Sequence, residues 1–155
     1  MSHKFTNCLN NRGLRKFPIT TLNIEKEIKE SRNDLESAQK SLLELDYKWT
    51  IIKAYYSMFH AGKSLVISAG YIEKTHDCLI VAVEELFIDK GILPRSIVVD
   101  FRNAKTARES ADYGLTYGKD SAEGTVQNAE QMYQIVSQYL MKQGFPISHY
   151  NRKDT

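Results

Sequence analysis

Residues 47–69, with the sequence YKWTIIKAYYSMFHAGKSLVISA, decide the fold class of this chain. Apolar side chains recur in this stretch at steps of three, four and seven residues, which places them on one face of an α-helix. That face carries Ile51, Ile52, Tyr55, Phe59, Val66 and Ala69. Gly70 follows directly and can adopt the left-handed conformation that ends many helices. The stretch therefore predicts one long helix from about Tyr47 to Ala69.

The same periodicity predicts further helices on both sides of this stretch. Before it, one helix face is shared by Ile24, Ile28, Leu35, Ala38, Leu42 and Leu45. Thr20, Thr21 and Asn23 are candidate N-caps for that helix, because their side-chain oxygens can accept from free backbone N–H groups. After it, a third helix is expected from Thr75 to Gly91, with an apolar face of Leu79, Val83, Leu86 and Phe87.

Two more helices follow. The fourth begins near Pro94, and its face carries Ile97, Phe101, Ala104, Arg108 and Ala111. A break is expected from Gly114 to Gly124. The fifth helix then carries Val126, Ala129, Tyr133, Val136 and Leu140 and ends at Gly144. Since no run alternates apolar and polar residues for the length of a strand, we predict an all-α fold: an antiparallel up-and-down bundle of four main helices plus a fifth.

Composition divides the chain into three parts. Residues 21–145 form the predicted bundle. Residues 1–20 are basic and rich in turn-forming residues as far as Pro18, which favours either a mobile arm or a strap that lies on the body. Residues 146–155 are expected to form a C-terminal tail. A length of 155 residues is enough for one domain with a core of its own.

Composition also excludes several classes of protein. The chain is 42% hydrophobic and 26% charged, as soluble globular domains are, and its formal net charge of +2 is too small to indicate a nucleic-acid binder by itself. No stretch approaches the roughly 18 apolar residues of a membrane span. No apolar run follows Met1 as it would in a secretory signal. We therefore expect a cytoplasmic protein with no membrane partner.

The two cysteines, Cys8 and Cys78, lie far apart without a CxxC pair or a companion histidine. This spacing argues against a disulfide framework and against a structural zinc site. We expect both to be reduced thiols, which suits a cytosolic protein. The four histidines are scattered, so no metal site and no cofactor is predicted, and the standard phosphate-loop, zinc-helix and nucleophile-elbow motifs are missing from the sequence.

The stretch Arg108-Glu109-Ser110-Ala111-Asp112-Tyr113 is the strongest candidate site. Arg108 falls on the apolar face of its predicted helix, and Asp112 follows about one turn later. Two interpretations are open. The pair can be an ion pair within one helix, which stabilises by roughly a few tenths of a kcal/mol. It can equally be part of a polar site in which the planar guanidinium binds phosphate.

Two histidines and a tyrosine are further candidates. In residues 54–62, AYYSMFHAG, Tyr56 and His60 share a helix face, although aromatic residues at helical spacing usually belong to the core. Gly62 weakens a helix by about 1 kcal/mol relative to alanine, which favours a close helix approach at this point. His76 follows Thr75 at a helix start, where a neutral imidazole is favoured. It can be a general base, a brace or plain surface.

Together, residues 54–62, Gly70, Thr75-His76, Phe87, Gly91 and residues 108–114 (RESADYG) resemble the HEPN domain, and within it the UPF0332 branch. The resemblance extends from about Ile24 to Leu140. It implies a helical bundle that usually dimerises. Many members of this family pair with a minimal nucleotidyltransferase as toxin and antitoxin, so a homodimer and such a nucleotidyltransferase are the expected partners.

The resemblance also implies a chemistry. Active members are metal-independent RNA endonucleases with an R-x4-6-H motif, whose arginine binds the scissile phosphate and whose histidine acts on the 2′-hydroxyl. In this sequence the permitted histidine positions after Arg108 hold Tyr113, Gly114 and Leu115, and those after Arg102 hold Ala107, Arg108 and Glu109. A tyrosine with a pKa of about 10 is a poor general base. RNA cleavage is therefore expected to be weak or absent unless His60 or His76 substitutes.

Three functions follow. The first, which the sequence favours, is a subunit that binds nucleotide or RNA around Arg108, Asp112 and Tyr113, with Arg102 and Tyr56 as further contacts, beside a nucleotidyltransferase. In some pairs of the family that partner adds AMP to a tyrosine near the motif, a role open to Tyr113. The second is an active metal-independent endoribonuclease toxin that uses Arg108, Tyr113 and a displaced histidine. The third is a structural helical dimer.

Overall fold

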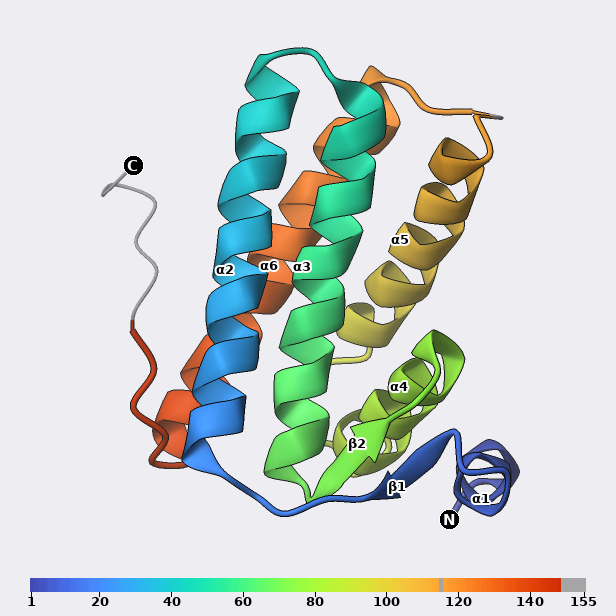
Figure 1. The fold of residues 1–155 in the computed structure, drawn as a ribbon, viewed down its shortest axis with the longest axis vertical. Helices are drawn as coiled ribbons and strands as arrows, with labels where there is room; N and C mark the ends of the chain where they lie inside the picture. The colour runs from blue at the N-terminus through green and yellow to red at the C-terminus, as the bar shows by residue number, and fades with distance from the viewer. Residues whose placement is uncertain (115, 149–155) are drawn as a thin grey trace.

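The computed structural model describes residues 1–114 and 116–148. Its elements are α1 (His3–Asn10), β1 (Leu14–Lys16), α2 (Thr21–Leu43), α3 (Tyr47–Ser68), β2 (Tyr71–Glu73), α4 (His76–Val83), the π-helical turn η1 (Glu84–Ile88), α5 (Ser96–Asp112) and α6 (Lys119–Lys142) (Figure 1). The predicted all-α bundle is confirmed.

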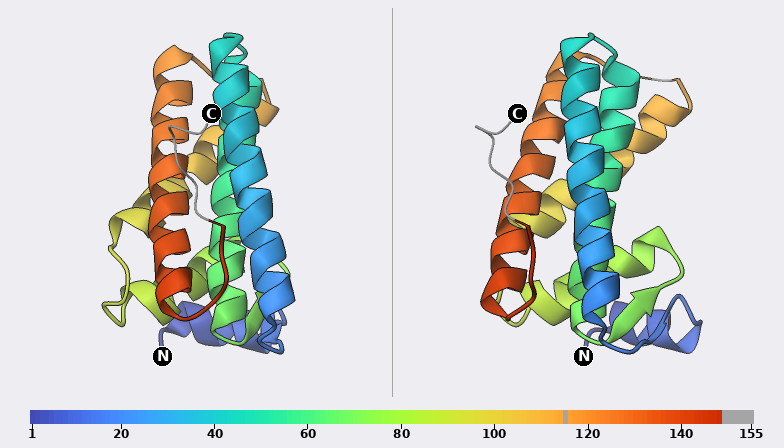
Figure 2. Two further views of the ribbon diagram at one scale, coloured as in Figure 1. Left: turned by 90° about the vertical axis from the view of Figure 1, so that its left-hand side faces the viewer. Right: turned by 60° about the vertical axis from the view of Figure 1, so that its left-hand side comes forward.

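Helix α3 is the centre of the bundle. It packs against α2, α4, α5 and α6, and the long helices α2, α3 and α6 run side by side (Figures 1 and 2). Because neighbours surround it, α3 is buried on several faces: Ile51, Ala54, Tyr55, Met58, Ala61 and Leu65 are all fully buried. Helix α5 lies across α3 on the side away from α2 (Figure 1). The aromatic face of α3 is therefore turned toward α4 and α5.

Local capping fixes where α2 and α3 begin. The Thr20 hydroxyl accepts a hydrogen bond from the Asn23 amide at 3.3 Å, and the Asp46 carboxylate accepts one from the Trp49 amide at 3.3 Å. These caps begin the two helices at the predicted positions. The expectation that Leu45 belongs to the apolar face is wrong. Leu45 lies in the turn with φ 60°, and 67% of it is exposed.

Helix α6 begins earlier than predicted, at Lys119 rather than after Gly124. Gly124 was expected to end the break, yet it lies inside the helix. The reason is packing: Ala122, in the first turns of α6, is buried in a small cluster with Ile51, Ile52 and Ala111. This burial offsets the cost of about 1 kcal/mol that a glycine brings to a helix.

The N-terminal segment packs on the body, as in the strap alternative for residues 1–20. Phe5 and Leu14 are buried in the main core, and β1 pairs antiparallel with β2, with Leu14 opposite Glu73. Each strand has three residues, which is too short for an alternating pattern to be recognised in the sequence. At the other end, residues 146–148 of the predicted tail return along α2, and residues 149–155 lie outside the described residues.

Cys8 and Cys78 form a disulfide, with their Cα atoms 5.7 Å apart. The expectation of two reduced thiols is therefore wrong. The sequence separation of 70 residues concealed the pairing, because nothing local showed that α1 folds back on α4. The bond ties the N-terminal segment to the first turn of α4. The state of the two cysteines therefore does not indicate a cytosolic protein.

No described helix is both long enough and apolar enough to cross a membrane.

The close approach predicted at Gly62 is confirmed. A Cβ atom at this position would lie 2.9 Å from Cε2 of Phe101, so only glycine lets the Phe101 ring of α5 rest directly on α3. Phe101 itself is fully buried. This contact brings the whole inner face of α5 close to α3, which is what allows Arg108, two turns further along α5, to reach the aromatic residues of α3.

Candidate functional site

Arg108 lies on the inner face of α5, with 19% of its side chain exposed. Its Nη1 donates to the Asp112 carboxylate at 3.0 Å, so the ion pair expected within the helix is present. Its Cζ lies 5.0 Å from the centre of the Tyr55 ring on α3, a cation–π distance. Its Nε is buried without a hydrogen-bond partner among the described residues. Asp112 thus engages Nη1 of the guanidinium, and the Tyr55 ring lies against it.

His76 contacts the same tyrosine. Thr75 caps α4 by accepting from the Cys78 amide at 3.1 Å, which fixes the turn that carries His76. Nδ1 of His76 is 2.6 Å from the Tyr55 hydroxyl. The imidazole stacks on Tyr55 with centroids 5.8 Å apart and makes a tilted contact with Phe59 at 4.4 Å. We refer to Arg108, Asp112, Tyr55 and His76 as the Arg108 cluster.

Burial and charge both favour a neutral His76. Burial lowers the pKa of its imidazole, and the cations Arg108 and Lys105 lower it further. Burial also raises the pKa of the Tyr55 hydroxyl, so Tyr55 keeps its proton at neutral pH. With that hydroxyl as donor, Nδ1 of His76 accepts and the proton of the neutral ring lies on Nε2. The cluster is thus the Arg108–Asp112 ion pair beside two neutral, hydrogen-bonded rings.

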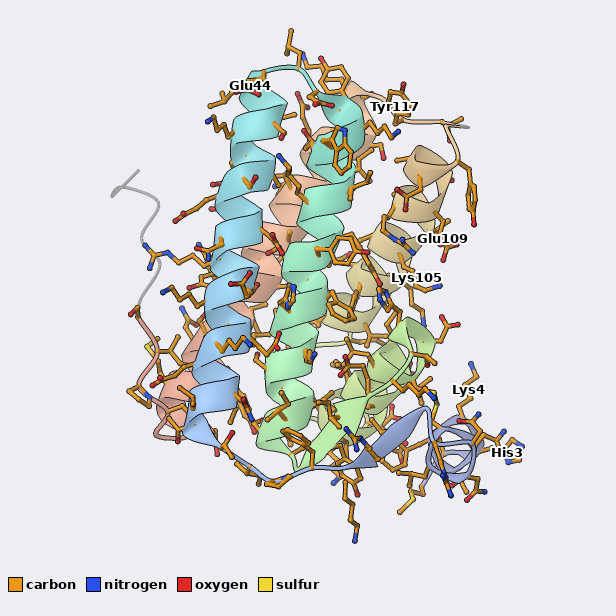
Figure 3. The ribbon with its side chains drawn as sticks, viewed as in Figure 1. His3, Lys4, Glu44, Lys105, Glu109 and Tyr117 are labelled. Atoms are coloured by element: carbon orange, nitrogen blue, oxygen red, sulfur yellow. A yellow bond between two sulfur atoms is a disulfide. The ribbon has the colours of Figure 1, made fainter. Side chains whose placement is uncertain are left out.

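Lys105 extends the positive charge of the cluster by one turn of α5. Its Nζ is 2.6 Å from a Glu109 carboxylate oxygen and 3.1 Å from Asp77. The hydrogen bond to Glu109, followed by that to Asp77, raises the pKa of Lys105. Nη2 of Arg108 is 4.0 Å from the same Glu109 oxygen, so the two cations are neighbours. Lys105 and Glu109 are labelled on α5 in Figure 3.

His60 is not part of this cluster, although it lies only one residue beyond Phe59. Its Nδ1 is 2.7 Å from Glu27, and its Nε2 is 3.7 Å from Asp34, both on α2. Lys63 bridges Glu27 at 3.6 Å and Glu73 at 3.5 Å. We refer to His60, Glu27, Asp34, Lys63 and Glu73 as the His60 network. The structure thus brings His76, and not His60, to Arg108.

The other predicted site residues lie at the margins. Tyr56 is half-buried and makes an edge contact with Tyr55 at 5.3 Å. Tyr113 follows the end of α5 and is 79% exposed. Arg102 is ion-paired with Glu84 of η1 and does not contact Arg108 through any described interaction. Of the positions where the family motif permits a histidine, Leu115 lies outside the described residues.

Two residues of the site were missed in the sequence. Tyr55 was assigned to the core, and it is fully buried, yet its hydroxyl joins His76 while its ring supports Arg108. A buried tyrosine hydroxyl needs a hydrogen-bond partner, and this requirement was the available signal. Lys105 lies three residues before Arg108, which places the two on adjacent turns of one helix. That spacing was visible in the sequence.

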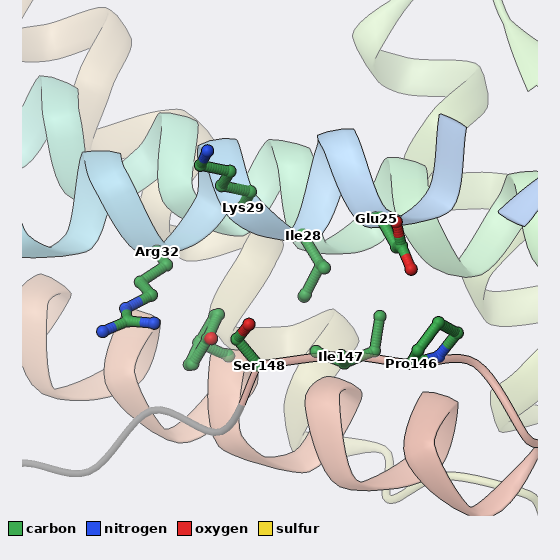
Figure 4. Close-up of a pocket in the computed structure, with 8 residues that line it drawn as sticks. Glu25, Ile28, Lys29, Arg32, Pro146, Ile147 and Ser148 are labelled. Atoms are coloured by element: carbon green, nitrogen blue, oxygen red, sulfur yellow. The ribbon is translucent and has the colours of Figure 1, made fainter. Parts of the chain in front are cut away.

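Other features of the described residues do not point to a different site. No group of three or more histidine, cysteine or acidic side chains in residues 1–114 and 116–148 is arranged to hold a metal ion. A pocket of about 250 Å³ lies between α2, α6 and residues 146–148, with Glu25, Ile28, Lys29 and Arg32 along one wall (Figure 4). None of the predicted site residues lines it.

Comparison with known proteins agrees with this fold. The chain is 35% identical over 72 residues to the UPF0332 protein PH1297 of Pyrococcus horikoshii. The alignment covers 46% of this chain and 51% of that relative, so it spans about half the length of each. A model of the HEPN domain matches residues 24–139, which include most of α2, all of α3 to α5 and most of α6. The resemblance noted in the sequence is thus confirmed, and the chain belongs to the HEPN domain family.

Proposed function

We propose that this chain is a phosphate-binding HEPN subunit, which holds RNA or a nucleotide through the guanidinium of Arg108. The observation that carries the proposal is the position of Arg108 over Tyr55, where Asp112 and Glu109 lie beside Nη1 and Nη2 and the buried Nε has no hydrogen-bond partner among the described residues. An arginine whose plane is already fixed loses little conformational entropy when it binds a phosphate through two parallel N–H groups. Asp112 and Tyr113 lie at the edge of the same site.

The charge of the surroundings supports an anionic ligand. Arg108 and Lys105 both lie near His76, and together they disfavour a proton on its imidazole. A phosphate at this point would reduce the repulsion between the cations Arg108 and Lys105. Because one face of the site is formed by buried aromatic residues, part of the interaction takes place away from water, where charge-assisted hydrogen bonds are stronger.

The proposal is tested by binding of uridine monophosphate and of a single-stranded oligouridylate to the wild type and to Arg108→Ala. We expect Arg108→Ala to weaken both by about tenfold or more, because a hydrogen bond to a charged group contributes about 1.5–3 kcal/mol. Arg95→Ala is a matched control, since Arg95 is also an arginine at α5 and pairs with Asp89. Equal binding by Arg108→Ala and wild type would contradict the proposal. If the wild type binds neither ligand and Arg108→Ala is only less stable, the function as a structural dimer is favoured.

The partners expected from the family belong to the same proposal. We infer a homodimer and an association with a minimal nucleotidyltransferase in a cytoplasmic toxin–antitoxin pair. Tyr113 supports the second inference, because a side chain that is 79% exposed can reach the active site of a modifying enzyme. Co-expression with a minimal nucleotidyltransferase should add one AMP to the wild type and none to Tyr113→Phe, as measured by intact mass. Equal labelling of the two chains would contradict the assignment.

A second candidate function is favoured by the position of His76. A metal-independent endoribonuclease needs a phosphate ligand and a group that moves protons. Here Arg108 and a neutral imidazole both contact one tyrosine. If the chain cleaves RNA in the presence of a chelator, cleavage should be lost in Arg108→Ala and in His76→Ala and retained in His60→Ala. Cleavage that survives His76→Ala would show that His76 is not the group that moves protons in the reaction.

A further inference from the structure

A second pocket lies beside the Arg108 cluster, between α1, α4 and α5. It has a volume of about 400 Å³ and an apolar wall from Ile80 and Val81 of α4. Its polar side chains include Lys4 of α1 and Arg102 and Lys105 of α5, with Asp77 of α4 as the one carboxylate. Three cations and one anion give this pocket a net positive charge. Figure 3 shows Lys4 and Lys105 on this side of the molecule.

We propose that this pocket binds the phosphate of the next nucleotide along a single-stranded RNA whose neighbouring phosphate is held by Arg108. The inference rests on the proposed function, and it assigns a polynucleotide rather than a free nucleotide as the ligand of the site. Lys105 connects the two positions, since it lines the pocket and also shares a Glu109 oxygen with Arg108.

Lys4 is the cation of the pocket that is most open to a ligand. It is exposed, and no ion pair of Lys4 is found within residues 1–114 and 116–148. Arg102, by contrast, is paired with Glu84, and Lys105 with Asp77 and Glu109. A phosphate that enters the pocket therefore gains a new partner in Lys4 without breaking an existing pair.

The N-terminal segment completes this pocket. Lys4 lies outside residues 24–139, the part that matches the HEPN domain, so the pocket extends beyond the matched bundle. Helix α1 is held in place by the Cys8–Cys78 disulfide and by the burial of Phe5. The same disulfide joins α1 to α4, which supplies both Asp77 and the apolar wall. The position of Lys4 is therefore fixed relative to Lys105.

Carboxylates limit the extent of the site. Beyond Lys4 and Arg102 the surface is lined by Glu84, Glu85 and Asp89, three negative charges that repel a further phosphate. The geometry thus accommodates one additional phosphate on this side of Arg108 and not a continuous track.

The test compares a single-stranded oligouridylate with uridine monophosphate. We expect Lys4→Glu and Arg102→Gln each to weaken oligouridylate binding by about fivefold to tenfold, and to lower its salt dependence by about 0.7 in the log–log slope, the value for one phosphate contact on a single strand. Binding of the monophosphate, measured by NMR titration, should stay unchanged. Lys4 is exposed, so its replacement should leave the fold intact.

Lys26→Glu is the matched control, because Lys26 is an exposed lysine on α2 and its replacement changes the net charge equally. Equal weakening by Lys4→Glu and Lys26→Glu would overturn the inference, since it would show a general effect of charge. If Arg108→Ala weakens both ligands while Lys4→Glu and Arg102→Gln weaken neither, the inference is wrong and the proposed function stands. If Arg108→Ala affects neither ligand, the proposed function is wrong. The assignment of a neighbouring phosphate is then wrong too, because it rests on that function.

Discussion

The two histidines close to the aromatic face of α3 lie in opposite electrostatic environments. His60 is surrounded by carboxylates, with Glu27 at 2.7 Å and Asp34 at 3.7 Å, and Lys63 adds a cation that is itself paired with Glu27 and Glu73. His76 is bonded to a neutral tyrosine and faces Arg108 and Lys105. The His60 network holds three carboxylates around one lysine and one histidine. The Arg108 cluster pairs one cation with one carboxylate and leaves Nε of Arg108 without a hydrogen-bond partner among the described residues.

This difference distinguishes a structural histidine from a candidate site. The His60 network joins α2, α3 and β2 through side chains that are mostly buried, so its hydrogen bonds hold elements together. The Arg108 cluster joins α3, α4 and α5 by ring stacking and leaves part of the guanidinium open to solvent. A phosphate binds where donors are still available. Among the described residues of the two regions, Nε of Arg108 is such a donor, whereas the atom without a partner in the His60 network is Oε2 of Glu73, an acceptor.

The largest expected effect comes from the disulfide, which supports one of the two regions. Cys8→Ser should lower the free energy of unfolding by about 2–4 kcal/mol, because the bond closes a long loop of the unfolded chain. Hydrogen exchange should rise in α1 and α4, next to the Arg108 cluster, and stay slow in α2 and the part of α3 around His60. Reduction of the wild type should give the same result. Equal loss of protection in both regions would show that they are not independent.

Next in size is the loss of Arg108. We expect Arg108→Ala to weaken phosphate ligands by about tenfold or more, with Arg108→Lys intermediate, since lysine keeps the charge but not the planar pair of donors. His60→Gln should leave binding unchanged, because Glu27 and Asp34 already surround that residue. Isothermal titration calorimetry of all three variants with a phosphate ligand measures which of the two regions contributes to binding. Weaker binding by His60→Gln than by Arg108→Ala would assign the phosphate site to the His60 network instead of the Arg108 cluster.

A smaller effect is expected from Glu27→Gln, which removes a charge from the His60 network. It should lower stability by about 1 kcal/mol, the contribution of a typical hydrogen bond, without changing ligand binding. Burial raises the pKa of Glu27, but the hydrogen bond from His60 and the charge of Lys63 outweigh it, so the pKa is lowered overall. The stability from Glu27 is thus present above its ordinary pKa of 4.5 and is lost as the pH falls through the lower folded value.

Urea unfolding from pH 6 down to pH 3 (about the range in which carboxylates titrate) measures this loss as the difference between Glu27→Gln and wild type. Asp34 and Glu73, whose pKa values are raised by burial, are present in both proteins and affect both curves. The difference between the two proteins should shrink as the pH falls. A difference that stays constant with pH would mean that the Glu27 carboxylate is not ion-paired in solution.

The smallest expected effect is on the titration of His76. Burial, then Arg108 and Lys105, lowers its pKa below the ordinary value of 6.5. The stability that neutral His76 contributes is therefore present above pH 6.5 and is lost as the pH falls through the lower folded value. NMR should show the lowered pKa in the wild type and a partial rise in Arg108→Ala, with no change in Arg95→Ala. An unchanged His76 pKa in Arg108→Ala would mean that the Arg108 guanidinium does not lie close to the His76 imidazole in solution.

The predictions that succeeded depended on local signals. Thr20 and Gly70 mark helix ends through their own side chain or backbone, so α2 and α3 could be predicted almost to the residue. Gly62 predicted a close helix contact for the same reason. Arg108 was selected because an arginine on an apolar helix face needs a partner, and its pair with Asp112 lies within one helix.

The failures all involve contacts between distant parts of the chain. The Cys8–Cys78 bond, the β1–β2 pairing and the link from Tyr55 to His76 each join segments whose proximity depends on the complete fold. The choice between His60 and His76 was of the same kind. Both are near the right helix in sequence, and only the arrangement of α2, α4 and α5 around α3 assigns one to carboxylates and the other to Arg108.

The most direct test of this account is an NMR titration of both imidazoles with uridine monophosphate, in the wild type and in Arg108→Ala. We predict that the resonances of His76 shift, that its pKa rises as the ligand neutralises Arg108 and Lys105, and that His60 is unaffected. In Arg108→Ala the shifts of His76 should disappear. A response at His60, or the same response at His76 with and without the Arg108 guanidinium, would contradict the assignment of the Arg108 cluster as the phosphate site.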